Sequence, residues 1–395
     1  MSVVEDYVTL GLRLGRHVDG LVDAYYGPPE LADAVEAEDL RPAAALLADA
    51  ESLLVGLEST DLDEARRGSL QDQARGLHTY ARVLAGEGLG YLDEVEGCYG
   101  VRPERVPEAT FAAAHERLDE LLPGAGSLEE RYEAWRAASF VPAERIEELM
   151  RPMLAVLRRL TATVVELPGD EEFTLELVAN EPWAAFNYYA GGGRSRIAVN
   201  SDFPFTAAEL VHLAAHEGYP GHHTEHAVKE RLLFVEGGYL EESIFLVPTP
   251  QALISEGIAE AGPELLVDDA ADDELAQICA TAGVSFDPAA TRRIREAREP
   301  LGVVTRNAAI LIHEDGMSVE DARAYVARWA LAPPHRAERM VDFVVDPTWR
   351  AYVTTYTEGK RLCRAYVDGD VARLRRLLTE PVRVADLLAT VSSGP

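Results

Sequence analysis

Residues 206–226 read TAAELVHLAAHEGYPGHHTEH, and the rest of the chain is best interpreted outward from this stretch. Thr206 is followed three residues later by Glu209, which is the spacing of a capping box at the start of a helix. Apolar residues then recur at helical spacing, which predicts a helix that continues at least to Glu217. Pro220 interrupts that helix, because proline lacks an amide hydrogen and collides with the preceding turn. The stretch therefore predicts a helix followed by a sharp turn.

Histidine is concentrated in this stretch, which holds five of the ten histidines in the chain. A metal-binding helix of the zinc hydrolases carries two histidines one turn apart, with a glutamate beside the first. His216 and Glu217 supply the first half of that motif, but Pro220 occupies the place of the second histidine. The turn adds two residues and brings His222 or His223 back toward the metal. Spacing alone leaves open which of these two is the ligand.

A third ligand is expected on another helix, because catalytic zinc takes three protein ligands and keeps one position open. Residues 250–262 read PQALISEGIAEAG and predict a largely apolar helix. Glu256 lies in its middle, where a carboxylate without a partner would be costly. Glu260, one turn later on the same face, is placed to accept a hydrogen bond from the other nitrogen of a liganding histidine. We therefore predict a zinc ion held by His216, His222 and Glu256.

The remaining histidines of interest receive different interpretations. His212 lies one turn before His216, where it either supports the site or packs in the core. His226 is expected to cap a helix or to face solvent. His313 and Glu314 precede an Asp-Gly pair, so they are interpreted as the end of a helix rather than as a second metal site.

Helical periodicity dominates the first 165 residues. Apolar residues recur at helical spacing in the segments 3–21, 43–57, 70–85, 108–122 and 146–164. The Gly-Pro-Pro run at 27–29 predicts the end of one helix and the start of the next. The chain is helical again from residue 206 to its end, with breaks at prolines. This pattern predicts a mainly α fold.

A small sheet is expected before the metal-binding helix. Residues 173–178 and 194–200 alternate as strands do, and a flexible glycine-rich turn at 188–193 separates them. We expect the two strands to form a small antiparallel sheet, whose second strand pairs with an extended substrate as an edge strand. The chain then forms a single domain, residues 1–395, with an N-terminal helical part (1–165) and a part that joins the sheet to the metal-site helices (166–395).

The composition limits the partners. A formal charge of −31 repels phosphate backbones and anionic lipid heads, so we expect neither a nucleic acid nor a membrane partner. The three cysteines are widely separated, which argues against a disulfide framework and fits a reducing compartment. No apolar run approaches the roughly 20 residues that span a bilayer. The first residues also lack the features of a secretory signal. We expect a cytoplasmic protein.

The motifs resemble a known family. The strings HEGYPGHH (216–223) and SEGIA (255–259) are similar to those of the bacterial domain-of-unknown-function family 885 (DUF885). Residues 25–29 and 352–359 are similar to it as well, so the resemblance covers nearly the whole chain. That family resembles the zincin-type metallopeptidases whose third metal ligand is a glutamate. The resemblance implies a helical zincin-like fold and peptidase chemistry.

The predicted function is a zinc-dependent hydrolase, a metallopeptidase that acts on short peptides. The metal lowers the pKa of water from about 15.7 toward 7, and Glu217 takes the proton and passes it to the leaving amine. Two residues are predicted donors to the attacked carbonyl oxygen: His223 by its adjacency, and Tyr356 by the resemblance and its position. Three alternatives remain: a zinc hydrolase of a non-peptide amide or ester, a metal- or ligand-binding protein without turnover, and a purely structural helical protein.

Overall fold

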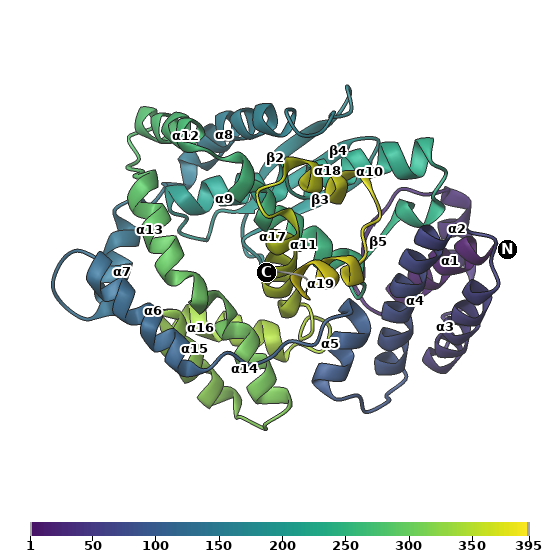
Figure 1. Cartoon of the computed structure of the whole chain (residues 1–395). Helices are drawn as coiled ribbons and strands as arrows, with labels where there is room; N and C mark the ends of the chain where they lie inside the picture. The colour runs from purple at the N-terminus through teal and green to yellow at the C-terminus, as the bar shows by residue number, and fades with distance from the viewer. Residues whose placement is uncertain (1, 393–395) are drawn as a thin grey trace.

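A computed structural model describes residues 2–392, and the chain in it is mainly helical (Figure 1). Five helices fall on the five segments predicted in the first 165 residues: α1 (Val3–Gly15), α3 (Ala43–Glu58), α4 (Glu64–Leu84), α6 (Glu108–Leu121) and α8 (Ile146–Thr161). Capping boxes open α1 and also α7 (Leu128–Ala137) and α9 (Ala207–Glu217). In each, a Ser or Thr side chain accepts a hydrogen bond from the amide of a Glu three residues on. The mainly α prediction is confirmed.

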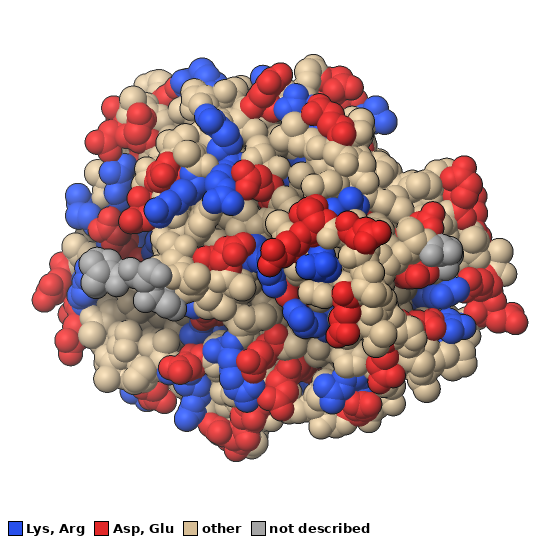
Figure 2. Space-filling view, turned by 45° about the vertical axis from the view of Figure 1, so that its right-hand side comes forward, with Lys and Arg blue, Asp and Glu red and all other residues tan. Residues whose placement is uncertain are grey.

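The other helices complete the body of the molecule. They are α2 (Pro29–Ala37), α5 (Tyr91–Tyr99), α10 (His222–Lys229), α11 (Pro250–Leu266), α12 (Asp269–Thr281), α13 (Pro288–Arg298), α14 (Val304–His313), α15 (Val319–Ala330), α16 (Pro334–Val345), α17 (Lys360–Val367), α18 (Val371–Thr379) and α19 (Val384–Ser392). Among the described residues, no helix has the length and apolarity needed to cross a bilayer. Figure 2 shows acidic side chains spread over the visible face with basic ones between them.

The segment before the Gly-Pro-Pro run is a strand, so the prediction of a helix ending there is wrong. α1 ends at Gly15, and Gly20 has a φ of +78°, which a continuing right-handed helix would not allow. β1 (Val22–Tyr25) then pairs antiparallel with β5 (Ile244–Leu246). The register shifts between Val22 and Ala24, so Asp23 occupies a bulge, a feature that redirects a side chain.

A three-stranded sheet precedes the helix α9, in the order β2 (Glu172–Val178), β4 (Arg194–Asn200), β3 (Ala185–Gly191). The sheet is mixed rather than antiparallel, because β2 runs parallel to β4 and only β3 is antiparallel to it. Residues expected in a flexible turn, Tyr188 and Tyr189, belong to β3, and the tight turn is made by three glycines with positive φ. β4 therefore has a neighbour on each side and is not an edge strand.

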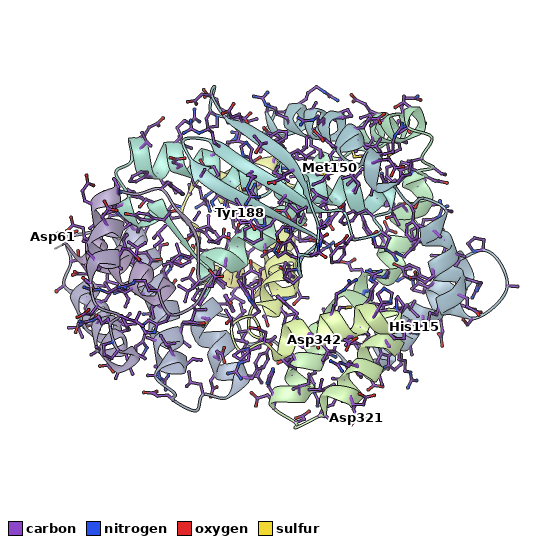
Figure 3. The ribbon with its side chains drawn as sticks, turned by 180° about the vertical axis from the view of Figure 1, so that it is seen from behind. Asp61, His115, Met150, Tyr188, Asp321 and Asp342 are labelled. Carbon is purple, nitrogen blue, oxygen red and sulfur yellow. The ribbon has the colours of Figure 1, made fainter. Side chains whose placement is uncertain are left out.

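The two faces of this sheet differ. Met150 of α8 shares one buried apolar cluster with Ile197 and Val199 of β4. On the opposite face, the guanidinium of Arg196 stacks on the ring of Tyr188 at 3.9 Å from its centroid. Figure 3 labels Met150 on α8 and Tyr188 on the sheet. The helix-covered face packs on the core that also carries α9, which places the start of α9 beside the sheet.

Helix α11 runs through the largest apolar cluster and packs against α17 and the π-helical segment Thr355–Gly359. This contact is close because both sides carry glycine. A Cβ on Gly257 would lie 2.5 Å from the carbonyl oxygen of Gly359, and a Cβ on Gly359 would lie 3.0 Å from the amide nitrogen of Gly257. The close approach brings the segment that contains Tyr352 and Tyr356 against Glu256.

Candidate metal centre

The predicted turn after α9 is present and returns the chain toward the helix. α9 ends at Glu217, the Tyr219–Pro220 peptide bond is cis, and α10 begins at His222. A Cβ on Gly221 would lie 2.6 Å from the carbonyl oxygen of Ala215 and would overlap the carbonyl oxygen of His216. Only glycine therefore allows the turn to pack this closely on the end of α9.

Three side chains from three helices meet at this turn. The Nε2 atoms of His216 and His222 are 3.2 Å apart, and His216 Nε2 is 3.3 Å from Oε2 of Glu256. His222 Nε2 lies 3.8 Å from Oε1 of the same carboxylate. Donors at about 2.0–2.1 Å from a tetrahedral zinc ion would lie roughly 3.3 Å from one another. The three side chains proposed from the sequence are thus brought together at distances that fit a metal ion.

Glu256 has the environment of a ligand rather than of a structural carboxylate. It is 3% exposed, and its Oε1 accepts a hydrogen bond of 2.6 Å from the hydroxyl of Tyr352. Its Oε2 is buried and has no hydrogen-bond partner among the described residues. A buried carboxylate oxygen without a partner is costly, and a cation at the meeting point of the three donors would remove that cost.

The charged groups of the centre shift one another's pKa values. Burial works to lower the pKa of His216, but Glu256 and Glu260 raise it well above its ordinary value. Burial likewise works to raise the pKa of Glu256, but His216 and His222 lower it. The carboxylate is therefore ionised, which is the form in which it can bind a metal ion.

A carboxylate and a lysine lie behind His216. Oε1 of Glu260 is 3.6 Å from Nδ1 of His216 and 3.2 Å from Nε2 of His212. Lys360 Nζ donates a hydrogen bond of 3.0 Å to the other carboxylate oxygen. His212, His216 and Glu260 also lie close enough to form a metal-binding group of their own. The lysine ammonium already neutralises Glu260, which fits a supporting role for that carboxylate and for His212.

A similar arrangement lies behind His222. Its Nδ1 is 3.0 Å from the hydroxyl of Ser255. Ser255 also acts on Glu225. Burial works to raise the pKa of Glu225, but Lys229, His226 and Ser255 together lower it below its ordinary value. Lys229 donates a buried hydrogen bond of 2.6 Å to Glu225. An Nδ1–H that donates to Ser255 leaves the Nε2 lone pair of His222 free for a metal.

Glu217 lies at the last position of α9, is 6% exposed and follows the first ligand directly. The amide of Asn187, on β3, donates a hydrogen bond of 2.6 Å to its backbone carbonyl and so fixes the end of the helix. Burial, and then the charges of Glu256 and Glu217, raise the pKa of Tyr356. Tyr356 is 40% exposed as a whole residue, its raised pKa keeps the hydroxyl hydrogen in place, and its ring lies 5.4 Å from that of Tyr352, which donates to Glu256.

Asp23 is an acidic residue near enough to this centre to feel its charges, and the sequence did not indicate it. Burial, followed by the charges of Glu217 and Glu256, raises its pKa to about 7. Its side chain has no hydrogen bond or ion pair among the described residues. The sequence does not indicate a role for Asp23, because a single Asp at the bulge of a four-residue strand belongs to no motif.

His223 is not part of the centre, which corrects the prediction that it donates to an attacked carbonyl. It is 0% exposed, and its Nδ1 lies 2.8 Å from the hydroxyl of Ser195 on β4. Its Nε2 lies 2.8 Å from a carboxylate oxygen of Glu171. Because successive side chains of a helix point in different directions, His222 faces α9 and α11 while His223 faces the sheet. His223 fixes α10 to the sheet.

Of the two remaining histidines, His226 differs from its prediction and His313 agrees with it. His226 was expected to cap a helix or face solvent, but it is 5% exposed and stacks on the ring of Tyr189, with centroids 5.0 Å apart. The expectation for His226 is therefore wrong. His313 is the last residue of α14 and lies 2.7 Å, through Nε2, from the carbonyl oxygen of Val344. It ends a helix, as predicted.

No family model matches the chain, and no curated protein sequence matches it. The resemblance to family 885 therefore stays a prediction. The fold is similar to that of the putative lipoprotein from Colwellia psychrerythraea, with a TM-score of 0.52 and 15% identity over 92% of this chain and 69% of that chain.

Two other solved structures are more distant. A putative lipoprotein of unknown function from Shewanella oneidensis has a TM-score of 0.44 and 13% identity, over 89% of this chain and 76% of that chain. The M32 carboxypeptidase from Deinococcus radiodurans R1 has a TM-score of 0.38 and 12% identity, over 99% and 93%. The likeness to the Colwellia protein concerns the fold alone, and these two are too distant to add to it.

Proposed function

We propose that this protein is a zinc-dependent hydrolase that cleaves short peptides at the centre formed by His216, His222 and Glu256. One observation carries the proposal: the side chains of His216, His222 and Glu256, from separate helices, approach one another to within 3.2–3.8 Å, and Glu217 directly follows His216. A binding protein without turnover has no need of a base at that position. The orphaned Oε2 of Glu256 further supports a bound cation.

The residues around the centre have separate roles in this proposal. Zinc, when bound, supplies the positive charge that makes a water molecule acidic near neutral pH. Glu217 takes the proton of the attacking water and returns it to the leaving amine. Tyr356 donates a hydrogen bond to the oxygen of the attacked carbonyl, where negative charge develops. Tyr352 holds Glu256 in place through its hydroxyl.

The proposal is tested by metal content. The parent protein is compared with His216→Ala, Glu256→Ala and, as a matched control, His335→Ala, which changes an exposed histidine on α16. We expect about one zinc per chain in the parent and in the control, and loss in the two site variants. No zinc uptake from a micromolar solution would refute the metal centre.

Catalysis is tested separately with a peptide library. The zinc-loaded parent should cleave peptides, and Glu217→Gln should bind zinc but not cleave. Cleavage by Glu217→Gln at the parental rate would refute the role of the base. If the parent binds zinc but cleaves only small-molecule amides or esters, the alternative zinc hydrolase replaces the peptidase.

A further inference from the structure

Arginine side chains gather around the N-terminal half of α9, although the protein as a whole is strongly acidic. Arg136 of α7 is 5% exposed in its side chain and donates a hydrogen bond of 2.9 Å to Glu209 of α9. Arg336 of α16 lies close enough to Arg136, and to Arg298 of α13, for their positive charges to interact with its own. Figure 1 shows α9, α13 and α16 on the same side of the molecule.

Two of these guanidinium groups have no acidic partner at ion-pair distance among the described residues. Arg336 forms neither an ion pair nor a side-chain hydrogen bond there. Burial, followed by the charge of Arg136, lowers its pKa, and Glu209 offsets this only in part. Arg298 lies over the ring of Tyr132 at 5.4 Å, and its Nε is buried without a hydrogen-bond partner. An anion bound beside Arg336 would relieve the repulsion from Arg136, which Glu209 offsets only in part.

A third unpaired guanidinium extends the group. Arg339 follows Arg336 by three residues on α16, so the two share one face of that helix. Its guanidinium lies over the ring of Phe203, just before α9, at 4.7 Å from the centroid. The arginine group therefore contacts the chain just before α9, at Phe203, and the first turn of α9, at Glu209.

One face of α9 leads from this group to the metal centre. Glu209, His212 and His216 follow one another at three and four residues and therefore lie on one face. Glu209 and His212 have side chains that are 39% and 51% exposed, so solvent and small molecules reach this face. Seven residues of helix separate Glu209 from His216, a rise of about 10 Å. An extended peptide covers that distance with about three residues.

We propose that Arg336 and Arg298 bind the C-terminal carboxylate of a peptide about three residues beyond the bond that the metal centre cleaves. This inference rests on the proposed function for the position of the cleaved bond. The anion site itself requires only the arginines. Guanidinium is suited to it because its planar donors bind a carboxylate through two hydrogen bonds. The protein then selects short peptides with a free C-terminus.

Binding to the Glu217→Gln protein tests the site, with and without zinc. The probes are tetra-alanine labelled at its N-terminus, its C-terminal amide, and an amidated version whose last residue is Glu. Fluorescence anisotropy gives the dissociation constants. We expect the free acid to bind at least about tenfold more tightly than the simple amide, because a charge-assisted pair is lost. Arg336→Gln and Arg298→Gln should remove this preference, and Arg295→Gln, which changes an exposed arginine on α13, should keep it.

Each contrary result would refute one part of the proposal. Equal binding of acid and amide by the parent refutes the anion site, and so does a preference that survives in both arginine variants. Binding of the Glu-ended amide as tightly as the free acid refutes the C-terminal assignment. Arg336→Gln should not lower the melting temperature, because it relieves repulsion, and a clear decrease would make Arg336 structural. The preference is measured also in the metal-free protein, so failure of the zinc site does not obscure it.

Discussion

Gly221→Ala is the substitution that most directly tests whether the turn after α9 builds the metal centre. The new Cβ would lie 2.6 Å from the carbonyl oxygen of Ala215, where real Cβ atoms stay beyond 3.0 Å, and it would overlap the carbonyl oxygen of His216. Relief requires the turn and the end of α9 to separate by about 1 Å or more. The displaced carbonyl belongs to His216, a proposed ligand, and the turn leads directly into a second proposed ligand, His222.

The expected losses follow from that displacement. Loss of a single supporting partner lowers metal affinity about 10–100-fold, and a shift of about 1 Å exceeds the tolerance of a functional site. Gly221→Ala should therefore weaken zinc binding by at least about a hundredfold and cost more than about 1 kcal/mol of stability. Chelator competition measures the affinity, and urea unfolding of the metal-free protein measures the stability.

Gly302→Ala is the matched control, because a Cβ there meets nothing within 4 Å. It should leave both quantities unchanged. If Gly221→Ala binds zinc as tightly as the parent, then the position of the turn does not determine the geometry of the centre, and the reasoning fails.

Three further predictions concern single side chains. Tyr356→Phe should lower kcat for peptides about a hundredfold with little change in KM, and an unchanged kcat would exclude it as the donor. His226 has a pKa lowered to about 3 by burial, so only the unfolded chain takes up its proton between about pH 6.5 and 3. Stability then falls with acidification, and His226→Phe should reduce the loss in urea unfolding between pH 6.5 and 5 by about 2 kcal/mol; equal pH dependence would contradict this. Lys360→Met should weaken zinc binding about 10–100-fold in chelator competition, because it frees Glu260, whereas unchanged affinity would make the lysine dispensable.

The side chains that meet at the candidate centre could be predicted from the sequence because each lies in a locally determined element. Thr206 and Glu209 fix where α9 begins, and the spacing from there fixes the face that carries His216. The apolar stretch around Glu256 makes its carboxylate conspicuous. Helical periodicity was sufficient for five of the N-terminal helices for the same reason, since the pattern repeats over several turns, but it did not indicate α5 and α7.

The parts that the sequence did not predict depend on contacts between distant segments. Asp23 reaches the centre only because β1 pairs with β5, more than two hundred residues away in the chain. The parallel pairing of β2 with β4 requires β3 to lie on the far side of β4, which alternation cannot indicate. The orientation of His223 depends on Glu171 and Ser195, which are also remote in sequence.

The two lysines show how composition and geometry combine. Only two of the 37 basic residues are lysines, and both donate to carboxylates that lie behind the proposed ligands: Lys360 to Glu260, and Lys229 to Glu225. A lysine ammonium is a compact charge that fits beside one carboxylate oxygen, whereas a planar guanidinium needs room for a fork of donors. Lys229 is 7% exposed, and its ammonium donates a buried hydrogen bond to Glu225. In a chain that otherwise uses arginine, each of the two lysines places one compact charge on a carboxylate behind a proposed ligand, and these carboxylates lie next to His216 and to the serine that contacts His222.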